Sequence, residues 1–569
     1  MIMRTENAVA AVKTALSHAI KPPKGRRVMV ETGDSAGFKH LMAWKASRVM
    51  ATRSSRRAER IYVDAPNPRR RHDPSIVTAL ECSGLHSTTR TRRTILANPV
   101  GTGARKRPRG GAQSLWPIFA ANNPPSGKKP KGAKQVELSC IGVGAGPSNL
   151  SLACQIHEQI GQGALFLDRQ VAFRWHPGIA FDFSELQVSH FKDLVTLVNP
   201  RSAYTFVNYL YENGRLYHFL NAQFEAVFRA EFEQYLNWAF HRNPLVRGGE
   251  TVHEIRFDGE FRVRTDKAVL GARNVVVGIG KQAQIPPQFQ GWTGRNLFHS
   301  SVLLHIHPEV RRKHVCVVGG GQSGAEVMLH LVGLPKERRP ASITWVSQRE
   351  NYLPLDNSPF TNELFMPCFS DRFAAMSESQ RKLLLRRFVL ASDGISESTL
   401  RAIYQALYRH AFFELNRCDI TLRPGCTVSH CINAGAGHRL TLQHSMDEVE
   451  EVTADIVILA TGYENAVPDF LEPIAHRLEQ IDNELAIRED FSVSWDGPRD
   501  RRIFVQNASL GQRGLADPNL SLLAWRARRI LDSLLGRAPC ANPEHPGFIS
   551  HTSIESWPAS AAEEMGSGI

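Results

Sequence analysis

From residue 135 onward, the chain alternates short apolar runs with amphipathic stretches of helical period. The apolar runs include SCIGV at 139–143, VVVGIG at 275–280 and IVILATG at 456–462, and each is followed or ended by glycine. Between such runs, PSNLSLACQIHEQI at 147–160 repeats apolar positions every three to four residues, as a helix does. Apolar strands that alternate with helices are typical of an α/β chain. We therefore expect an α/β fold over this part of the sequence.

Residues 1–134 lack both periods and differ in composition from the rest. They are rich in Arg, Pro, Ser and Gly, as in NPRRRHDP at 67–74. They hold 27 lysines and arginines against 7 acids, whereas the whole chain has a net charge of +14, so the remainder is mildly acidic. We expect a disordered basic leader. We do not expect the leader to bind nucleic acid, because it has no interleaved aromatic residues and no known nucleic-acid-binding motif. We interpret it instead as a solvated tail or as the product of a reading frame begun too far upstream.

The sequence contains no signal for secretion or membrane insertion. No window approaches eighteen uninterrupted apolar residues, and the first thirty residues lack an apolar core with a cleavage site. The nine cysteines form no CxxC pair and no metal-like cluster with histidine. We expect a cytoplasmic protein with reduced thiols, no metal site and no membrane span.

The stretch VELSCIGVGAGPSNLSLA at 136–153 places three glycines and a proline between a strand and a helix. Backbone amides and the positive end of the helix dipole converge at such a turn, which suits a pyrophosphate. The next strand, ALFLD, ends in an acid where dinucleotide folds reach the adenosine ribose. Asparagine replaces the third glycine of the GxGxxG pattern. The candidates for this first dinucleotide site are Gly142, Gly144, Gly146, Pro147, Asn149 and Asp168.

A second fingerprint, HVCVVGGGQSGAEVMLHLV at 314–332, has the full GxGxxG spacing before a helix that we expect to open near Ala325. The strand that follows, SITWV, leads to Gln348 and Arg349. A cation at this position suits a ribose 2′-phosphate and favours NADPH over NADH; the alternative is an exposed arginine after a strand. The candidates for this second site are Gly319, Gly321, Gln322, Ser323, Gly324 and Arg349.

A later strand pattern, ADIVILATGYENAVP at 454–468, is interpreted as chain that returns to complete the first dinucleotide domain. Two dinucleotide folds, the second inserted into the first, are the architecture of flavoproteins that take hydride from a nicotinamide. A disulfide reductase would need a redox cysteine pair beside the flavin, whereas Cys140 and Cys154 fall inside the strand and helix of the first fingerprint. A flavin monooxygenase is therefore favoured.

These signals divide the chain into five segments. They are a basic leader (1–134), the first part of an FAD-binding domain (135–302), an NADPH-binding domain with a small helical substrate segment (303–439), the closing part of the FAD domain (440–538) and a tail (539–569).

Seven motifs resemble the N-hydroxylating flavin monooxygenases that act on lysine, ornithine and related amines in hydroxamate siderophore synthesis. They are GVGAGPSNLSLA at 142–153, FRWHPG at 173–178, LQVSHFKDLVTLVNP at 186–200, VVGGGQSGAE at 317–326, LDNSPFTNELFMP at 355–367, SDGIS at 392–396 and ATGYENAVP at 460–468. The family also carries asparagine in place of the third glycine. The resemblance spans about three quarters of the chain and implies FAD and NADPH as cofactors and a homo-oligomer.

The resemblance assigns roles to residues that the pattern alone leaves open. Trp175, His176 and Gln187 are expected along the flavin ring, although a Trp–His pair after a strand, taken alone, is more often core packing. Lys192 would bind a substrate carboxylate, although a lysine there could also be a solvated surface residue. Asn362 would hold the amino-acid end, with Gln187 and Asn362 as the catalytic candidates. GLADPNLSLLAW at 514–525 resembles the loop by the flavin, with Ser521 near cofactor and substrate.

By this resemblance, NADPH reduces FAD, dioxygen forms a C4a-hydroperoxyflavin, and a neutral terminal amine is hydroxylated. SDGISESTLRAIYQALY at 392–408 favours lysine or an aliphatic diamine such as putrescine or cadaverine, whereas DNSPFTNE at 356–363 is closer to the ornithine and diamine enzymes. We expect lysine or a diamine, with ornithine third. The alternative is a flavin-binding protein without turnover that uses its basic leader for interaction.

Overall fold

The computed structural model describes residues 138–539, except 415–417, 436, 445–447 and 482–483, together with residues 547–549. The leader, for which we predict disorder, lies outside the described residues, and so does most of the tail. No helix in the described part of the chain combines the length and apolar character that crossing a bilayer requires.

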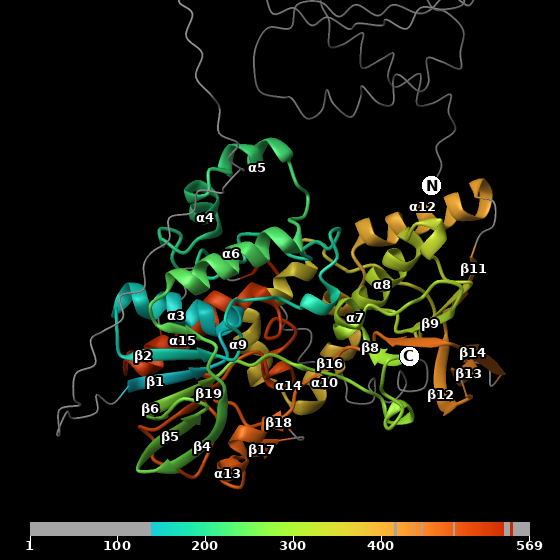
Figure 1. Cartoon of the computed structure of the whole chain (residues 1–569). Coiled ribbons are helices and arrows are strands. Elements are labelled where there is room, and N and C mark those ends of the chain that lie inside the picture. Colours follow the sequence, from blue (N-terminus) through green and yellow to red (C-terminus); the bar gives the residue numbers. More distant parts are fainter. Residues whose placement is uncertain are drawn as a thin grey trace, which may run out of the picture. The chain divides into compact units, whose positions relative to one another are not determined.

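The first sheet follows the order β3-β2-β1-β6-β5-β4, with β19 also paired to β6 (Figure 1). β1, β2, β3, β6 and β19 run parallel, and β4 and β5 continue from β6 as an antiparallel meander. Parallel strands covered on both faces are continuously apolar, which explains the runs in the sequence. The strands are β1 (Leu138–Val143), β2 (Ala164–Asp168), β3 (Val246–Gly248), β4 (Val252–Asp258), β5 (Glu260–Thr265), β6 (Val269–Val277) and β19 (Ile503–Val505).

The second sheet has five parallel strands in the order β11-β10-β9-β15-β8. A three-stranded antiparallel sheet, β12-β13-β14, and the short pair β7 and β16 accompany it. The strands are β7 (Gln282–Ala283), β8 (Leu297–His299), β9 (His314–Val318), β10 (Ser342–Val346), β11 (Asp419–Arg423), β12 (Cys426–Asn433), β13 (His438–His444), β14 (Val449–Ala454), β15 (Ile456–Leu459) and β16 (Tyr463–Glu464).

The pairing of β15 corrects one expectation. We expected Ile456–Leu459 to return to the first domain, but β15 lies between β8 and β9 in the second sheet. The inserted unit therefore extends from β8 to β15, residues 297–459, rather than 303–439. An apolar strand that is buried on both faces reads the same in either parallel sheet, so its sequence does not say which sheet it joins.

Helices cover the sheets. α3 (Pro147–Gln159) packs against α15 (Leu523–Leu534) on the first sheet, and α8 (Gln322–Gly333) packs against α12 (Glu397–Phe413) on the second. α3 begins with proline, whose missing amide hydrogen costs nothing at that position. α8 begins at Gln322, three residues before the expected start, because Gly321 is extended and caps it. α4 (Phe206–Glu212), α5 (Leu216–Ala222) and α6 (Arg229–Arg242) form an aromatic-rich layer with α3.

The helical segment that follows β10 in sequence belongs to the first core. It contains η5 (Thr361–Phe365), α9 (Pro367–Ala375), α10 (Glu378–Arg387) and α11 (Leu390–Asp393). Leu364, Phe369 and Phe373 pack in one apolar cluster with Leu152 of α3 and Trp525 of α15. The segment we assigned to the NADPH domain thus packs on the FAD side.

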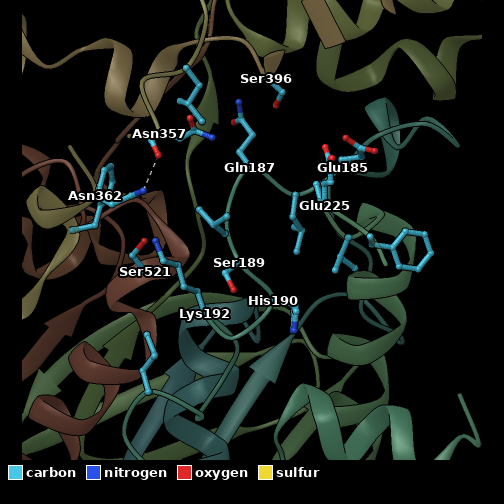
Figure 2. A pocket seen from close by; sticks show the side chains of 18 of the residues that line it. Glu185, Gln187, Ser189, His190, Lys192, Glu225, Asn357, Asn362, Ser396 and Ser521 are labelled. Atoms are coloured by element: carbon cyan, nitrogen blue, oxygen red, sulfur yellow. Dashed lines mark hydrogen bonds between the residues drawn. The ribbon is translucent and has the colours of Figure 1, made fainter. Parts of the chain in front are cut away.

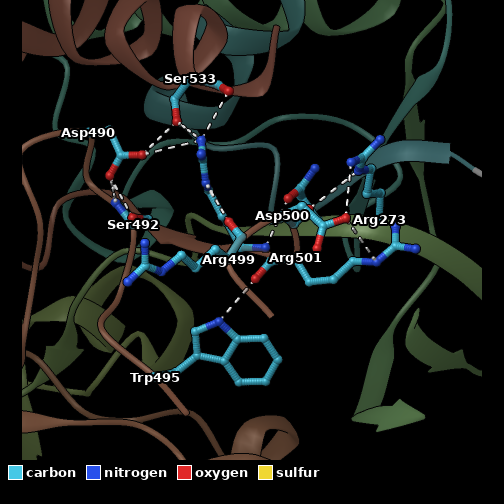
Figure 3. A network of polar contacts seen from close by, with 10 residues as sticks. Arg273, Asp490, Ser492, Trp495, Arg499, Asp500, Arg501 and Ser533 are labelled. Atoms are coloured by element: carbon cyan, nitrogen blue, oxygen red, sulfur yellow. Dashed lines mark hydrogen bonds and ion pairs between the residues drawn. The ribbon is translucent and has the colours of Figure 1, made fainter. Parts of the chain in front are cut away.

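Polar contacts connect the closing segment to the first sheet and join parts of the closing segment to one another (Figure 3). Arg273 of β6 pairs with Asp500 at 3.0 Å. The carboxylate of Asp490 accepts hydrogen bonds from the Ser492 and Ser533 hydroxyls at 2.5 and 2.6 Å, and Ser533 belongs to α15. Chain more than 200 residues from β6 is therefore held beside it.

Candidate functional site

The first glycine-rich turn joins β1 to α3. A Cβ on Gly142 would lie 2.1 Å from the Phe166 ring, and one on Gly144, whose φ is +83°, would lie 2.7 Å from the Gly278 carbonyl oxygen. These two glycines are therefore required by the fold itself. A Cβ on Gly146 would meet its nearest neighbour only at 3.7 Å. The protein itself would thus tolerate a side chain at Gly146, which lies with Pro147 at the N-terminus of α3, where a pyrophosphate is expected to bind.

Asn149 stabilises this turn. Its side chain is fully buried. Its amide nitrogen donates to the Gly144 carbonyl at 2.7 Å, and its amide oxygen accepts from Gln506 Nε2 at 2.6 Å. A Cβ on Gly278 would lie 2.6 Å from it. Asn149 therefore holds the turn in shape, and its predicted contact with the cofactor stays a prediction.

Asp168 lies at the end of β2, beside the same turn. One carboxylate oxygen accepts from the Ala145 amide at 2.7 Å and the other from the Gln170 amide at 2.8 Å. The structure thus brings Asp168 to the glycine turn, as the sequence predicts. Its contact with the adenosine ribose stays a prediction.

A buried ion pair that no sequence motif reveals contacts the first turn of α3. Arg526 and Asp517 are each 1% exposed, and their charged groups are 2.7 Å apart. Arg526 also donates to the Ser148 hydroxyl at 3.0 Å, in the first turn of α3. Asp517 accepts from the Ser509 amide at 2.8 Å. Because Ser148 and Arg526 are 378 residues apart, no local pattern could reveal this network.

In the second glycine-rich turn, between β9 and α8, close neighbours likewise require glycine. A Cβ on Gly319 would lie 2.1 Å from the Ala460 carbonyl oxygen, and one on Gly324 would lie 2.1 Å from that of Gly319. Gly321 is open, with its nearest neighbour at 3.8 Å. A cavity of about 980 Å³ lies in front of this turn and is also lined by Gln322 and Ser323. Its position at a helix N-terminus fits a dinucleotide.

Arg349 lines this second cavity beyond the end of β10. Its guanidinium donates to the Asp393 carbonyl at 2.8 Å. A cation here matches the charge of a ribose 2′-phosphate, and that contact stays a prediction.

A larger cavity of about 1290 Å³ brings together the predicted catalytic and substrate residues (Figure 2). Gln187, Lys192, Asn362 and Ser521 all line it, although they come from segments far apart in the sequence. Gln187 also lines the dinucleotide cavity, and its side-chain nitrogen donates to the Gly394 carbonyl at 3.1 Å. Gln187 therefore marks the junction of the two cavities.

Lys192 lies partly buried in this cavity, and burial lowers the pKa of its ammonium group. Its nitrogen is 5.5 Å from the centre of the Phe365 ring. Across the described residues, no carboxylate forms an ion pair with it. The Asn362 amide donates to the Asn357 carbonyl at 2.9 Å, and the Ser521 hydroxyl donates to Asn519 Oδ1 at 2.7 Å. The site therefore presents an uncompensated cation beside two polar side chains.

The cavity also contains carboxylates that the sequence analysis did not single out. Glu185, Glu225 and Glu397 line it, and the Glu185 carboxylate accepts from the Ser398 hydroxyl at 3.1 Å. Figure 2 shows the labelled Glu185 and Glu225 on the side of the cavity away from Lys192. Nothing in their local sequence distinguishes them from surface acids.

Trp175 and His176 line neither of these cavities. The Trp175 ring packs 5.8 Å from Phe232, in the aromatic layer, and the His176 ring is 5.8 Å from that of Tyr463. Tyr463 lines the dinucleotide cavity. The expected contact of Trp175 and His176 with the flavin stays a prediction.

Comparisons with known proteins agree with this arrangement. The sequence profile of the family described as L-lysine 6-monooxygenase/L-ornithine 5-monooxygenase matches residues 137–465. The L-lysine N6-monooxygenase of Escherichia coli is 38% identical over 403 residues, which cover 70% of this chain and 94% of the relative.

Two solved structures are also similar. The FAD-bound cadaverine monooxygenase of the desferrioxamine biosynthetic pathway, from Erwinia amylovora, has a TM-score of 0.68 and 27% identity, over 73% of this chain and 98% of that one. The ornithine N-hydroxylase of Kutzneria sp. 744, with reduced FAD, NADP⁺ and L-ornithine, has a TM-score of 0.65 and 27% identity, over 70% and 99%.

The two glycine turns lie at the N-termini of α3 and α8, as two dinucleotide sites require, and Gln187 lines both the cavity at α8 and the larger cavity. The sequence profile extends over both turns. The chain accordingly belongs to the L-lysine 6-monooxygenase/L-ornithine 5-monooxygenase family of flavin-dependent N-hydroxylating monooxygenases.

Proposed function

We propose that this enzyme hydroxylates the terminal amine of an amino acid, L-lysine or L-ornithine, and that the product supplies hydroxamate siderophore synthesis. The observation that carries the proposal is Lys192, a partly buried cation without a carboxylate partner among the described residues, in the same cavity as Asn362 and Ser521. A substrate carboxylate would neutralise this cation, and a diamine would not. The siderophore role is supported by the desferrioxamine pathway of one structural relative.

The sequence placed ornithine behind lysine and the diamines, but the relatives give no basis for that order. They include enzymes for lysine, cadaverine and ornithine at comparable coverage. Lys192 can discriminate amino-acid substrates from diamines by their carboxylate. It cannot discriminate lysine from ornithine, because these two differ only by one methylene group. We therefore propose the two amino acids together. The cytoplasmic location expected from the sequence and the homo-oligomeric state implied by the family resemblance remain predictions.

The residues of the cavity would act on the substrate as follows. When bound and reduced by NADPH, FAD would activate dioxygen; one oxygen atom goes to the amine and the other leaves as water. Lys192 would bind the substrate carboxylate and Asn362 the amino-acid end, which directs the terminal amine toward Gln187 at the junction of the cavities. The amine must be neutral to react, and with a pKa near 10.4 well under 1% is neutral at pH 7 in water. Enclosure by Phe365, Leu522 and Trp525 disfavours the charged form and raises that fraction.

Substitution of Lys192 tests the substrate class. A charge-assisted contact contributes about 1.5–3 kcal/mol, so Lys192→Ala should raise KM for lysine or ornithine by on the order of 10–100-fold. Flavin reduction by NADPH alone should be unchanged, because Lys192 does not line the dinucleotide cavity. For putrescine and cadaverine the change should be neutral or favourable, since it removes a like charge.

The assay is hydroxylamine formation from lysine, ornithine, putrescine and cadaverine by the wild type and the variant. Better turnover of a diamine than of either amino acid would contradict the assignment of Lys192. Product from none of the four would contradict the proposed function.

A further inference from the structure

The C-terminal segment at residues 547–549 binds a buried glutamate of the substrate cavity wall. Phe548 and Ile549 each donate their backbone amide to Glu363, at 3.0 and 2.8 Å, one to each carboxylate oxygen. A Cβ on Gly547 would lie 2.7 Å from the same carboxylate and 3.6 Å from the sulfur of Met366. The segment therefore fits closely against this side chain.

Glu363 depends on these two amides. The residue is only 9% exposed, and no lysine, arginine or histidine of the described part of the chain forms an ion pair with it. A buried carboxylate is costly unless donors surround it, and hydrogen bonds to an ionised group are among the strongest in proteins. Two successive backbone amides, about 185 residues away in the sequence, meet that need.

Glu363 lies on the short helical turn that also carries cavity residues. η5 spans Thr361–Phe365, and its residues Asn362 and Phe365 line the large cavity. Residues three apart in a 3₁₀ turn project from the same side, so Asn362 and Phe365 face the cavity together while Glu363 is directed elsewhere. Phe365 is also the ring beneath the Lys192 ammonium. Movement of this turn would displace both Asn362 and the surface against which Lys192 packs.

We propose that residues 547–549 hold η5 in place through Glu363 and thereby set the affinity for the amine substrate. Glu363 is a positioning residue, because it acts through Asn362 and Phe365 and does not touch the substrate. The inference rests on the proposed function for its kinetic consequence, whereas the contact itself is independent of any substrate. Residues 547–549, which belong to the predicted tail, thus support the wall of the site.

Two substitutions break the contact from opposite sides. Glu363→Ala removes the acceptor, and Gly547→Val places a side chain where the carboxylate lies. Glu363→Gln keeps one acceptor oxygen and should restore part of the effect. Gly294→Ala is the matched control, because a Cβ there meets nothing within 4 Å.

Both disruptive variants should raise KM for lysine or ornithine by about 10-fold, equivalent to about 1.4 kcal/mol, with kcat and NADPH-dependent flavin reduction within about twofold of wild type. Hydrogen–deuterium exchange, measured without substrate, should increase in peptides that cover residues 361–367. Gly294→Ala should match the wild type in every measurement.

Unchanged exchange in both disruptive variants would overturn the contact. Faster exchange with unchanged KM would overturn its effect on the substrate. If the wild type hydroxylates none of the amines, the proposed function fails, and exchange alone still tests whether residues 547–549 hold η5.

Discussion

Replacing Arg526 by methionine should destabilise the FAD-binding unit more than any exposed charge substitution. The side chains of Arg526 and Asp517 are each 1% exposed, so the variant leaves a buried carboxylate with one donor among the described residues, the Ser509 amide. Removing one partner of a buried ion pair costs about 3–5 kcal/mol, because the other charge stays desolvated. For a folding unit of roughly 200 residues this lowers the melting midpoint by on the order of 10 °C.

The assay is thermal unfolding of the FAD-loaded enzyme, followed by the rise in flavin fluorescence on release. Arg401→Met is the control, because its pair with Glu397 is 64% and 78% exposed and should contribute no more than about 1 kcal/mol. The double variant Arg526→Met with Asp517→Asn should recover part of the loss, since no unpaired charge remains. A midpoint for Arg526→Met within about 2 °C of the Arg401→Met midpoint would refute the reasoning.

The remaining predictions concern the two cofactor sites. Gly146→Val should reduce the FAD content while circular dichroism shows an intact fold, because the protein itself tolerates a Cβ at this position. Gly321→Val should retain FAD but slow the reduction of FAD by NADPH. The reverse pattern would show that the two sites are exchanged. Arg349→Ala should raise KM for NADPH by about 10–100-fold and leave KM for NADH unchanged, as measured by flavin reduction; equal effects on both would contradict a 2′-phosphate contact.

The sequence predicted those parts of the site that depend on local pattern. Both strand–turn–helix units were identified from their glycine spacing and apolar period, because these features are set by residues within one turn of each other. The convergence of Gln187, Lys192, Asn362 and Ser521 on one cavity was implied by family resemblance rather than by spacing.

Other features depend on contacts that no local pattern encodes. The sequence-based prediction placed β15 in the wrong sheet, because an apolar strand buried on both faces has the same pattern beside any neighbouring strand. The Arg526–Asp517 pair and the amides bound to Glu363 connect segments that are distant in sequence, and ordinary surface residues would look the same. The hydrogen bond that Asn149 accepts from Gln506 also joins distant segments, and its position in the motif did not reveal it.

The late position of β19 has a consequence for synthesis on the ribosome. β19 pairs with β6 at Val275–Val277 but is made more than 220 residues later, after the whole inserted unit. The second sheet, by contrast, is complete once residue 459 has emerged. Because domains generally fold as units during translation, the NADPH-binding unit can close first while β6 still exposes an unpaired edge. Nascent chains that stop before β19 should therefore recruit chaperones and aggregate, even though they contain every residue of the dinucleotide turn at α3.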